Sequence, residues 1–270
     1  MTKTVLITGA SSGFGKLTAR KFQAEGWNVA ATMRSPQKET ELTGLDNVAV
    51  IQLDVTRPDS IADAIAATNA RFGGIDAVVN NAGHGGHGMF EQFTDEEIRS
   101  MFETNVFGVL SVCRAILPQF RAQGAGVIVN ITSIAGIISG PTSGIYAATK
   151  FALEALTESM AMEYAGLGIR ICSVAPGAFK TGFTAANRNG TAEIDNQLKP
   201  YADALNAMVQ ERIDAMYANA PSATMVADRI FECVTSKVPF RNVVGPDGEA
   251  LVAALQSMPR QAFLDQLLSS

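Results

Sequence analysis

The chain has 270 residues, and its 47% hydrophobic content is enough to fill a substantial core, so we expect a single domain. Its net charge is −5 and it has no dense run of Lys or Arg, which argues against a nucleic-acid partner. Cys113, Cys172 and Cys233 are odd in number and far apart, so neither a disulfide framework nor a zinc site is expected.

The N-terminal segment and the apolar runs predict neither export nor a membrane span. Residues 1–10 lack the basic start, apolar centre and cleavage site of a signal peptide. Apolar runs such as residues 127–131 are interrupted by Gly or polar residues within a few positions. We therefore expect a cytoplasmic protein without a membrane-spanning helix.

Short β-branched runs alternate with longer amphipathic segments along the chain. Strands are expected over residues 4–8, 28–32, 48–53, 77–80, 126–131, 169–175 and 242–244. Helices are expected over residues 13–25, 59–72, 94–119 and 146–165, the third opening with a capping box at Thr94. This alternation predicts an α/β fold, a Rossmann-type doubly wound parallel sheet of about seven strands flanked by helices.

The alternation is interrupted after the sixth predicted strand. Residues 177–221 are longer than a simple strand-to-helix connection and include an expected helix near residues 202–217. Because long insertions at this edge of a sheet usually serve function, we interpret residues 177–221 as a substrate-binding insertion. Residues 236–270 contain prolines around short helical pieces, which predicts a C-terminal appendage to one domain that spans residues 1–270.

A glycine-rich turn, Thr8-Gly9-Ala10-Ser11-Ser12-Gly13-Phe14-Gly15, lies between the first predicted strand and the first helix. Gly9 permits a tight turn, Gly13 lets the backbone approach a pyrophosphate, and Gly15 allows close helix packing. Free amides at the helix start suit the phosphate charge. The spacing is G-x-x-x-G-x-G, unlike the common G-x-G-x-x-G, but the strand and helix around it predict a nucleotide site that includes Ser11, Ser12 and Phe14.

The end of the second predicted strand, Thr32-Met33-Arg34-Ser35, lacks the carboxylate that binds the ribose of NAD. Arg34 can pair bidentately with a 2′-phosphate, which favours NADP(H) and leaves NAD(H) possible. The alternative for Arg34 is an ordinary solvated charge. Asp54, followed by Val55 after the third strand, either accepts a hydrogen bond from the adenine amino group or caps the next helix.

Tyr146 and Lys150 in Tyr146-Ala147-Ala148-Thr149-Lys150 share one helical face, because they are four residues apart. A nearby cation stabilises phenolate over phenol, which makes Tyr146 a candidate proton donor near neutral pH. Ser133 precedes Tyr146 by thirteen residues. Asn80-Asn81-Ala82-Gly83, Asn105 and Pro176-Gly177 complete an ordered set of motifs along the same α/β pattern.

With these motifs the chain resembles the short-chain dehydrogenase/reductase family over about residues 4–181. The resemblance implies that Tyr146 is the general acid/base, that Lys150 lowers its pKa and binds the nicotinamide ribose, and that Ser133 hydrogen-bonds the substrate oxygen. It also implies that Asn105 interrupts the long helix and holds a water for proton relay. Further cofactor contacts are implied for Tyr146 itself, Asn81, Ala82, Gly83, Pro176, Gly177 and Thr181, the last at the carboxamide.

The substrate is expected to be lipophilic. Arg241-Asn242-Val243-Val244-Gly245-Pro246-Asp247 is similar to the tail of the 17β-hydroxysteroid dehydrogenase-like and retinol dehydrogenase-like branch. His84 and His87 have no third ligand nearby, so no metal is expected. An apolar pocket, with core packing as the alternative for each member, is predicted from Met89, Phe90, Ile137, Ile138, Phe179 and Phe183.

The resemblance predicts an NADP(H)-dependent enzyme that interconverts a carbonyl and a secondary or primary alcohol on a small molecule. One alternative is a 3-oxoacyl-carrier-protein reductase, which would need a basic docking surface for an acidic carrier, and the overall acidity of the chain argues mildly against it. Another is a non-catalytic nicotinamide-binding redox sensor, which the intact set of Asn105, Ser133, Tyr146 and Lys150 disfavours. The family usually forms a homodimer or homotetramer through its long helices. Substrate identity, stereochemistry and reaction direction are not set by these motifs.

Overall fold

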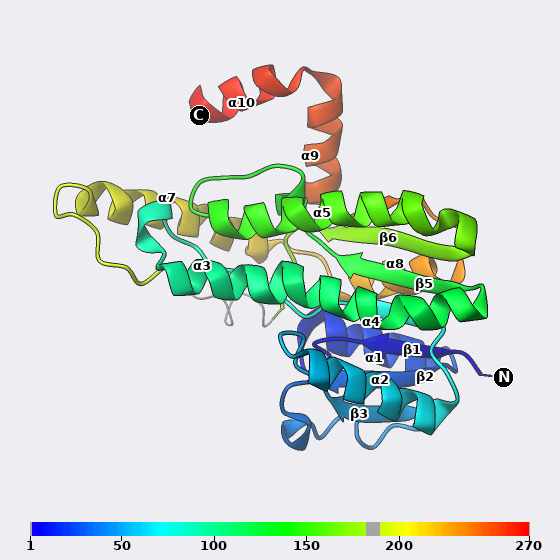
Figure 1. Cartoon of the computed structure of the whole chain (residues 1–270). Helices are drawn as coiled ribbons and strands as arrows, with labels where there is room; N and C mark the ends of the chain where they lie inside the picture. The colour runs from blue at the N-terminus through cyan, green and yellow to red at the C-terminus, as the bar shows by residue number, and fades with distance from the viewer. Residues whose placement is uncertain (1, 182–189, 270) are drawn as a thin grey trace.

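Seven parallel strands form one sheet in the computed structural model, which describes residues 2–181 and 190–269 (Figure 1). All seven predicted strands are present, and two of them have the predicted bounds. The strands are β1 (Thr4–Ile7), β2 (Asn28–Met33), β3 (Val48–Gln52), β4 (Ala77–Asn80), β5 (Gly126–Ile131), β6 (Ile169–Pro176) and β7 (Arg241–Val244). Since β7 pairs with β6, the region 236–270 contributes a strand to the main sheet as well as C-terminal helices.

The strand order is β3-β2-β1-β4-β5-β6-β7, which is the doubly wound order that the alternating pattern predicted. The order reverses between β1 and β4, where the two halves of the sheet diverge. In open α/β sheets ligands bind at this point, outside the carboxyl ends of the strands. The fold therefore predicts that a ligand binds at the turns that follow β1, β4, β5 and β6.

Helices cover both faces of the sheet (Figure 1). On one face lie α1 (Gly13–Ala24) and α8 (Thr224–Thr235). On the other face lie α2 (Pro58–Phe72), α4 (Gly108–Gln123) and α5 (Gly144–Tyr164). The central strands β1, β4 and β5 are thus buried on both sides, which explains why their sequences are almost continuously apolar.

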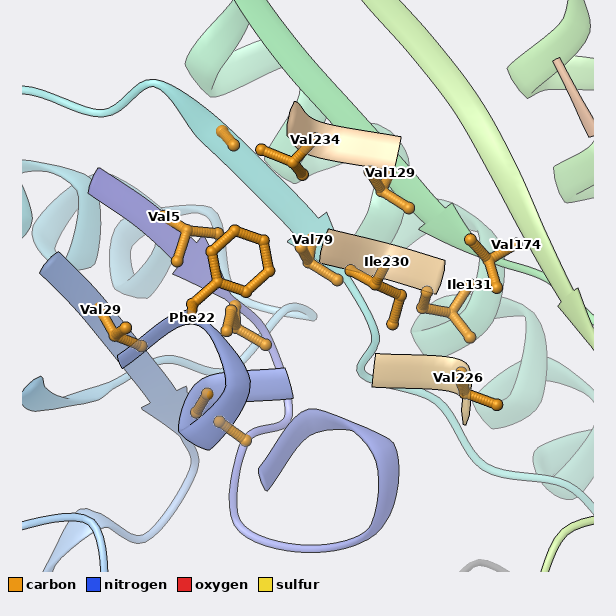
Figure 2. Close-up of a cluster of buried hydrophobic side chains, with 14 of the residues drawn as sticks. Val5, Phe22, Val29, Val79, Val129, Ile131, Val174, Val226, Ile230 and Val234 are labelled. Carbon is orange, nitrogen blue, oxygen red and sulfur yellow. The ribbon is translucent and has the colours of Figure 1, made fainter. Parts of the chain in front are cut away.

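Successive side chains along each strand enter opposite cores, because their direction alternates. Val5 and Ile7 of β1 pack with Phe22 of α1 and Ile230 of α8, whereas Leu6 packs with residues of α2 and α4. Figure 2 shows the first of these cores, in which Phe22 lies among the strand valines and α8 contributes Val226, Ile230 and Val234. Phe22 also meets Trp27 edge to face, with ring centroids 5.1 Å apart.

The long helix predicted from Thr94 is present but has an irregular centre. It consists of α3 (Asp95–Phe102), a π-helical turn η3 (Glu103–Phe107) and α4. The predicted capping box is present: the Glu97 amide donates to Thr94 Oγ1 at 3.2 Å, and Thr94 N donates to Glu97 Oε2 at 2.9 Å. A π-helical turn inserts an extra residue, so the side chains on its two sides are rotated relative to a regular helix.

The expectation that no segment is long and apolar enough to cross a membrane needs correction. The run Asp95–Gln123 meets that criterion by length and composition, with a mean hydropathy of 1.2. Half of its most apolar window is buried inside the molecule. Val112, Ile116 and Phe120 pack in the core beneath the sheet, which accounts for the apolar composition without a membrane.

The remaining elements are short turns and the C-terminal helices. The helix expected near residues 202–217 is α7 (Lys199–Ala218). In Figure 1, α9 (Pro246–Ser257) and α10 (Arg260–Ser269) rise above α5 on the side of β6 and β7. All three cysteines are free and buried. The short helical turns are η1 (Pro36–Lys38), η2 (Phe90–Gln92), η4 (Ile134–Gly136) and η5 (Ala165–Leu167).

Candidate active site

Most of the predicted site residues gather at the carboxyl ends of four neighbouring strands. The glycine-rich turn follows β1, the Asn81-Ala82-Gly83 turn follows β4, Ser133 follows β5, and Gly177 follows β6. The turn that carries Asn105 and the helix that carries Tyr146 are joined by a hydrogen bond from Asn105 Nδ2 to Thr149 Oγ1. Segments far apart in sequence therefore meet at the point where the strand order reverses.

The glycine-rich turn has the conformation that its sequence predicted. Gly9 and Gly13 have φ of +67° and +53°, a region that residues with a Cβ rarely occupy. A Cβ on Gly9 would lie 2.9 Å from Ala82 Cα, and one on Gly15 would collide with the Gly9 carbonyl oxygen. Close contact between this turn and the turn after β4 thus requires glycine at both positions.

The N-terminus of α1 suits a dinucleotide pyrophosphate. Within the described chain the Ser12 side chain makes no capping hydrogen bond to α1, so the first amides of the helix have no side-chain acceptor. A Cβ built on Gly13 would make an ordinary van der Waals contact with Thr181 Cβ, at 3.6 Å. Uncapped amides and the helix dipole are the features that hold phosphate groups at helix N-termini.

Asn81 supports the glycine-rich turn through its side chain. Its Nδ2 donates hydrogen bonds to the carbonyl oxygens of Thr8 and Gly9 at 2.9 and 3.0 Å. Thr8 Oγ1 in turn accepts from the amides of Asn81 and Ala82, each at 3.0 Å. The side chain of Asn81 therefore fixes the shape of the predicted phosphate site and has no amide hydrogen left for a ligand.

A cavity of about 220 Å³ lies beside the end of β2, where a coenzyme ribose was predicted. Arg34 is exposed, and no hydrogen bond or ion pair joins its side chain to the part of the chain that the structure describes. Ser11 and Lys16 of the first turn and helix lie on one wall of the cavity. The full lining is Ser11, Lys16, Met33, Ser35, Lys38, Glu39, Thr40 and Glu41.

Two carboxylates that the sequence pattern did not indicate also line this cavity. Lys16 Nζ lies 3.1 Å from Glu39 Oε2 and 3.0 Å from Glu41 Oε1. Burial alone would raise the pKa of Glu39, but the amides of Leu42 and Glu41 and the Lys16 ammonium hold it below its usual range. Glu39 is therefore a charged neighbour of the predicted 2′-phosphate site, neutralised by Lys16.

Asp54 does not cap the helix that follows it. Its Oδ1 accepts hydrogen bonds from Thr56 N at 3.0 Å and Thr56 Oγ1 at 2.8 Å, a local turn that precedes α2. The N-cap residue of α2 is Arg57, whose side chain makes no capping hydrogen bond. Val55 is 7% exposed and packs against Gly108 of α4, where a Cβ would lie 2.7 Å from Val55 Cγ2. Its side chain is therefore a core contact.

Tyr146 lies beside Ser133 and Lys150. The Ser133 hydroxyl hydrogen-bonds the Tyr146 phenol, and Lys150 Nζ lies 5.7 Å from the centre of the Tyr146 ring. Burial raises the pKa of Tyr146 to about 12, while the hydrogen bond with Ser133 acts in the opposite direction. The sequence predicted a pKa near neutrality because it gave the spacing of Lys150 but not the depth of burial.

Lys150 is itself buried, and its pKa lies closer to neutral pH than that of an exposed lysine. Its Nζ donates to the Ile131 carbonyl oxygen at 2.9 Å. Burial lowers the pKa of Lys150 to about 8, and the nearby Glu154 carboxylate opposes that change. Because the ammonium bonds the end of β5 and lies beside the tyrosine ring, Lys150 connects the sheet with the predicted acid/base residue.

Asn105 lies in the π-helical turn η3 and is 1% exposed. Its Oδ1 accepts from His84 N at 3.0 Å, and its Nδ2 donates to the His84 carbonyl oxygen at 2.8 Å. The same Nδ2 donates to Thr149 Oγ1 at 3.1 Å, and Thr149 Oγ1 donates to the Tyr146 carbonyl oxygen at 2.7 Å. Asn105 therefore ties the loop after β4 to the helix that carries Tyr146.

Gly177 and Thr181 lie beside two segments that the motifs did not connect. A Cβ on Gly177 would overlap the Asp247 carboxylate, whose Oδ2 accepts a hydrogen bond from Ala178 N at 2.8 Å. Thr181 faces Gly13 across the predicted pyrophosphate site. The predicted nicotinamide-contact segment, which starts at Pro176, is thus held by α9 on one side and opens toward the glycine-rich turn on the other.

The described residues among those predicted to form an apolar pocket line neither of the two cavities, and they differ in burial. Phe179 is 3% exposed and meets Phe14 edge to face at 5.7 Å, so it belongs to the core, whereas Phe90 is 72% exposed. Phe183 lies outside the described residues. A cavity of about 180 Å³ lies next to the Asn105 loop and is lined by His84, Gly85, Phe93, Glu96, Glu97, Ser100 and Met101. Residues 2–181 and 190–269 contain no cluster of three possible metal ligands.

Sequence reasoning missed several residues beside the site. Glu154 follows Lys150 by four residues, so helical spacing alone could have placed it on the same face as Lys150. Tyr217 of α7 raises the pKa of Tyr146, and Asp247 raises the pKa of Tyr217 after burial, so these groups are near neighbours. No local pattern indicated Tyr217 or Asp247, because both reach the site through tertiary packing.

Comparison with known proteins agrees with this geometry. The short chain dehydrogenase family matches residues 3–192. The chain is 38% identical over 254 residues to a 3-ketodihydrosphingosine reductase of Bacteroides thetaiotaomicron, covering 94% of this chain and 91% of the relative. A short-chain dehydrogenase of Streptomyces avermitilis superposes with a TM-score of 0.84 at 34% identity, covering 100% of this chain and 98% of the other. The structure of ElxO with NADP bound superposes with a TM-score of 0.74 at 28% identity, covering 90% of this chain and 96% of the other.

The chain therefore belongs to the short-chain dehydrogenase/reductase family. It is an oxidoreductase that acts on alcohol or carbonyl groups with a nicotinamide cofactor, and the prediction of family and fold is confirmed. The assignment to the 17β-hydroxysteroid dehydrogenase-like and retinol dehydrogenase-like branch stays a prediction.

Proposed function

We propose that the protein interconverts a lipophilic carbonyl compound and its alcohol with NADP(H), and that Tyr146 is the general acid/base. The observation that carries this proposal is the group formed by Ser133, Tyr146 and Lys150. The Ser133 hydroxyl bonds the phenol, and Lys150 Nζ is 5.7 Å from its ring. A buried phenol beside a buried ammonium is typical of a site that transfers a proton.

Each residue has a separate task in the proposed reaction. When bound, the nicotinamide supplies or accepts the hydride. Ser133 holds the substrate oxygen, and Tyr146 donates the proton to that oxygen in reduction or removes it in oxidation. Lys150 favours the phenolate electrostatically and binds the nicotinamide ribose. Asn105 positions the helix that carries Tyr146 through Thr149. Asn105 also holds a water through which the proton is relayed.

Coenzyme binding is assigned to the turns around the point where the strand order reverses. Gly9, Ser11, Ser12, Gly13, Phe14 and Gly15 would hold the pyrophosphate on the amides of α1, and Gly177 and Thr181 would meet the nicotinamide end. The preference for NADP(H) over NAD(H) rests on Arg34, which is exposed at the end of β2 where no acid follows it directly. Solved neighbours carry either NADP or NADH, so the preference rests on Arg34 alone.

The proposed substrate is lipophilic and carries a positive charge. Phe93 and Met101 supply apolar surface to the cavity beside His84, and Glu96 and Glu97 supply carboxylates at the same cavity. A long-chain amino ketone combines these two properties, and one relative is named for reducing such a compound. Residues 177–221, with α7, are proposed to cover this substrate.

Oligomer formation and location are proposed on physical grounds. Phe107 and Met162 are 51% and 70% exposed on the outer side of the long helices, which suits a homodimer or homotetramer formed through α4 and α5. Three free, buried cysteines suit a reducing cytoplasm.

The test is NADPH and NADH oxidation by wild type and Tyr146→Phe with steroid, retinoid, aliphatic, amino-ketone and acyl-thioester carbonyls. Tyr146→Phe should lower kcat by about 10²-fold or more, because the proton donor is lost. Tyr164→Phe, on the same helix, is the matched control and should keep its activity. Turnover of the acyl thioester alone would favour a carrier-protein reductase. Tight coenzyme binding without turnover of any carbonyl would favour a redox sensor.

A further inference from the structure

A buried carboxylate lies one helical turn beyond Lys150 and has no task in the mechanism above. Glu154 follows Lys150 by four residues on α5, so the two share a helical face. The residue is 3% exposed. A carboxylate at that depth requires a compensating role, because removing its charge from water is costly.

The contacts of Glu154 do not satisfy it fully. Its Oε2 accepts hydrogen bonds from Arg241 Nε at 2.8 Å and from Ser173 Oγ at 3.3 Å. Its Oε1 is buried and has no hydrogen-bond partner among the residues that the structure describes. A buried ion pair adds little net stability compared with an apolar side chain, and an unpaired buried oxygen is a further cost. Stability alone therefore does not explain a glutamate here.

Glu154 also lies against the turn that carries Ser133. A Cβ on Gly136, in η4, would lie 2.8 Å from the Lys150 carbonyl oxygen and 3.0 Å from Glu154 Cγ. The turn, Lys150 and Glu154 thus pack without intervening side chains. Any change at Glu154 acts at short range on the helix segment and the turn that hold Tyr146 and Ser133.

We propose that Glu154 is a positioning residue that keeps Lys150 in its ammonium form beside Tyr146. The proposal rests on the proposed function, since it gives Glu154 a purpose only if the Lys150 charge assists Tyr146. A negative charge one turn away favours the ammonium in a region of low dielectric constant. Arg241, 37% exposed, holds the carboxylate in place from β7 without removing its effect on Lys150.

The charged and titratable groups around this pair are few. Lys150 faces Tyr146 and Glu154 on its own helix, and Glu154 faces Arg241 from β7, while β6 contributes the uncharged Ser173. Tyr217 of α7 acts on Tyr146, and Asp247 of α9 acts on Tyr217. Glu154 is the group that opposes the effect of burial on the pKa of Lys150.

The test compares the pH dependence of kcat/KM for NADPH-linked reduction of the most active carbonyl of the panel, from about pH 6 to about pH 10. Glu154→Gln keeps the volume and removes the charge. Lys150 should then lose its proton at lower pH, moving the alkaline limb of the profile down by roughly 0.5 to 1 pH unit. Glu158→Gln, an exposed glutamate on the same helix, is the matched control and should leave the limb unchanged.

A second variant separates the electrostatic role from a structural one. Arg241→Gln breaks the same ion pair but leaves the Glu154 charge, so the alkaline limb should stay or move to higher pH. Equal downward shifts in both variants would show that only the bridge matters and would overturn the proposal. If Glu154→Gln does not fold, Arg241→Gln still decides, since a downward shift contradicts the proposal.

A measurement without substrate or coenzyme completes the test. The free energy of unfolding should rise with pH as Lys150 loses its proton in the folded state, and in Glu154→Gln this rise should begin at lower pH than in wild type. An unchanged onset would overturn the proposal. Failure of the proposed function is recognised separately, because it requires Tyr146→Phe to retain activity whatever the Glu154 variants do.

Discussion

Asn105 Nδ2 donates a hydrogen bond to Thr149 Oγ1 at 3.1 Å, which joins the π-helical turn η3 to the helix α5 one turn from Tyr146. Thr149 also contacts Tyr146 directly, because its hydroxyl donates a hydrogen bond to the Tyr146 carbonyl oxygen at 2.7 Å. Thr149 is fully buried, so neither partner can exchange this bond for one to water. The position of the Tyr146 backbone therefore depends on a polar contact between two helices.

Thr149→Val keeps the shape of the side chain but removes both hydrogen bonds. Leaving Asn105 Nδ2 with a buried unpaired hydrogen should lower the free energy of unfolding by about 1 to 3 kcal/mol. The freed Asn105 should also loosen Tyr146 and lower kcat about tenfold. Urea denaturation and steady-state kinetics measure the two effects. Thr235→Val, which loses only an exposed bond to the Phe231 carbonyl oxygen, is the control. An unchanged kcat would contradict the link to Tyr146.

Gly177→Ala tests the contact between the end of β6 and α9. The added Cβ would overlap the Asp247 carboxylate, so α9 or the segment after β6 must move. We expect a loss of about 1 to 3 kcal/mol in the free energy of unfolding, typical of overpacking, and weaker coenzyme binding. Denaturant melts and coenzyme titration measure these losses.

Asp247→Ala in the Gly177→Ala background should restore part of the stability, because it removes the group that the Cβ meets. A double-mutant cycle gives that coupling directly. Gly166→Ala is the control, since nothing lies within 4 Å of its Cβ and its backbone is unstrained. Additive effects of the two substitutions would show that the collision is relieved without strain.

The fold and much of the site were predictable because local patterns determine them. Alternation of apolar runs gave seven strands, and β4 and β5 have the predicted bounds. The tight turn at Gly9 was predictable from the glycine-rich motif between a strand and a helix, and Gly9 has φ of +67° there. The capping box at Thr94 is a four-residue pattern and was equally accessible. In each case the physical cause acts between residues close in sequence.

Other features depend on tertiary burial and could not be predicted locally. The spacing of Tyr146 and Lys150 indicated an attractive interaction, but burial raises the pKa of Tyr146 instead. Glu39 enters the coenzyme cavity because Lys16, 23 residues earlier, pairs with it at 3.1 Å. Asp247 reaches Ala178 across 69 residues of sequence. Helical periodicity does not reveal contacts over these separations.

Lys150 should make the stability of the protein depend on pH. Its pKa is about 8 in the folded chain and 10.5 ordinarily, so the unfolded chain holds more protons between these values. Stability therefore rises with pH through this window, by roughly 2 kcal/mol from about pH 7.5 to about pH 10 for this group alone. The raised pKa of Tyr146 has the opposite effect, because the folded chain then holds its proton longer than the unfolded chain. Tyr146 therefore lowers the free energy of unfolding only as the pH rises above its ordinary pKa of 10.0.

Urea denaturation of wild type and Lys150→Met across this range isolates the contribution of Lys150. The unfolding free energy of wild type minus that of Lys150→Met should rise with pH by the amount above. Lys237→Met, a substitution at an exposed position, should leave the pH dependence unchanged. A difference that is constant with pH would show that Lys150 titrates at its ordinary value.

The coenzyme cavity offers the last prediction, because Glu39 neutralises Lys16 beside the proposed 2′-phosphate site. Glu39→Gln keeps an oxygen to accept the amide hydrogen bonds of Glu41 and Leu42 but removes the charge. Lys16 should then attract the phosphate, lowering the Kd for NADPH by about three- to tenfold with little change for NADH. Calorimetry at low and high salt should show the gain decreasing with salt. Glu25→Gln, which removes one of the two carboxylates paired with Lys21 of α1, is the matched control. An equal gain for NADH and NADPH would mean that Lys16 does not reach the 2′-phosphate.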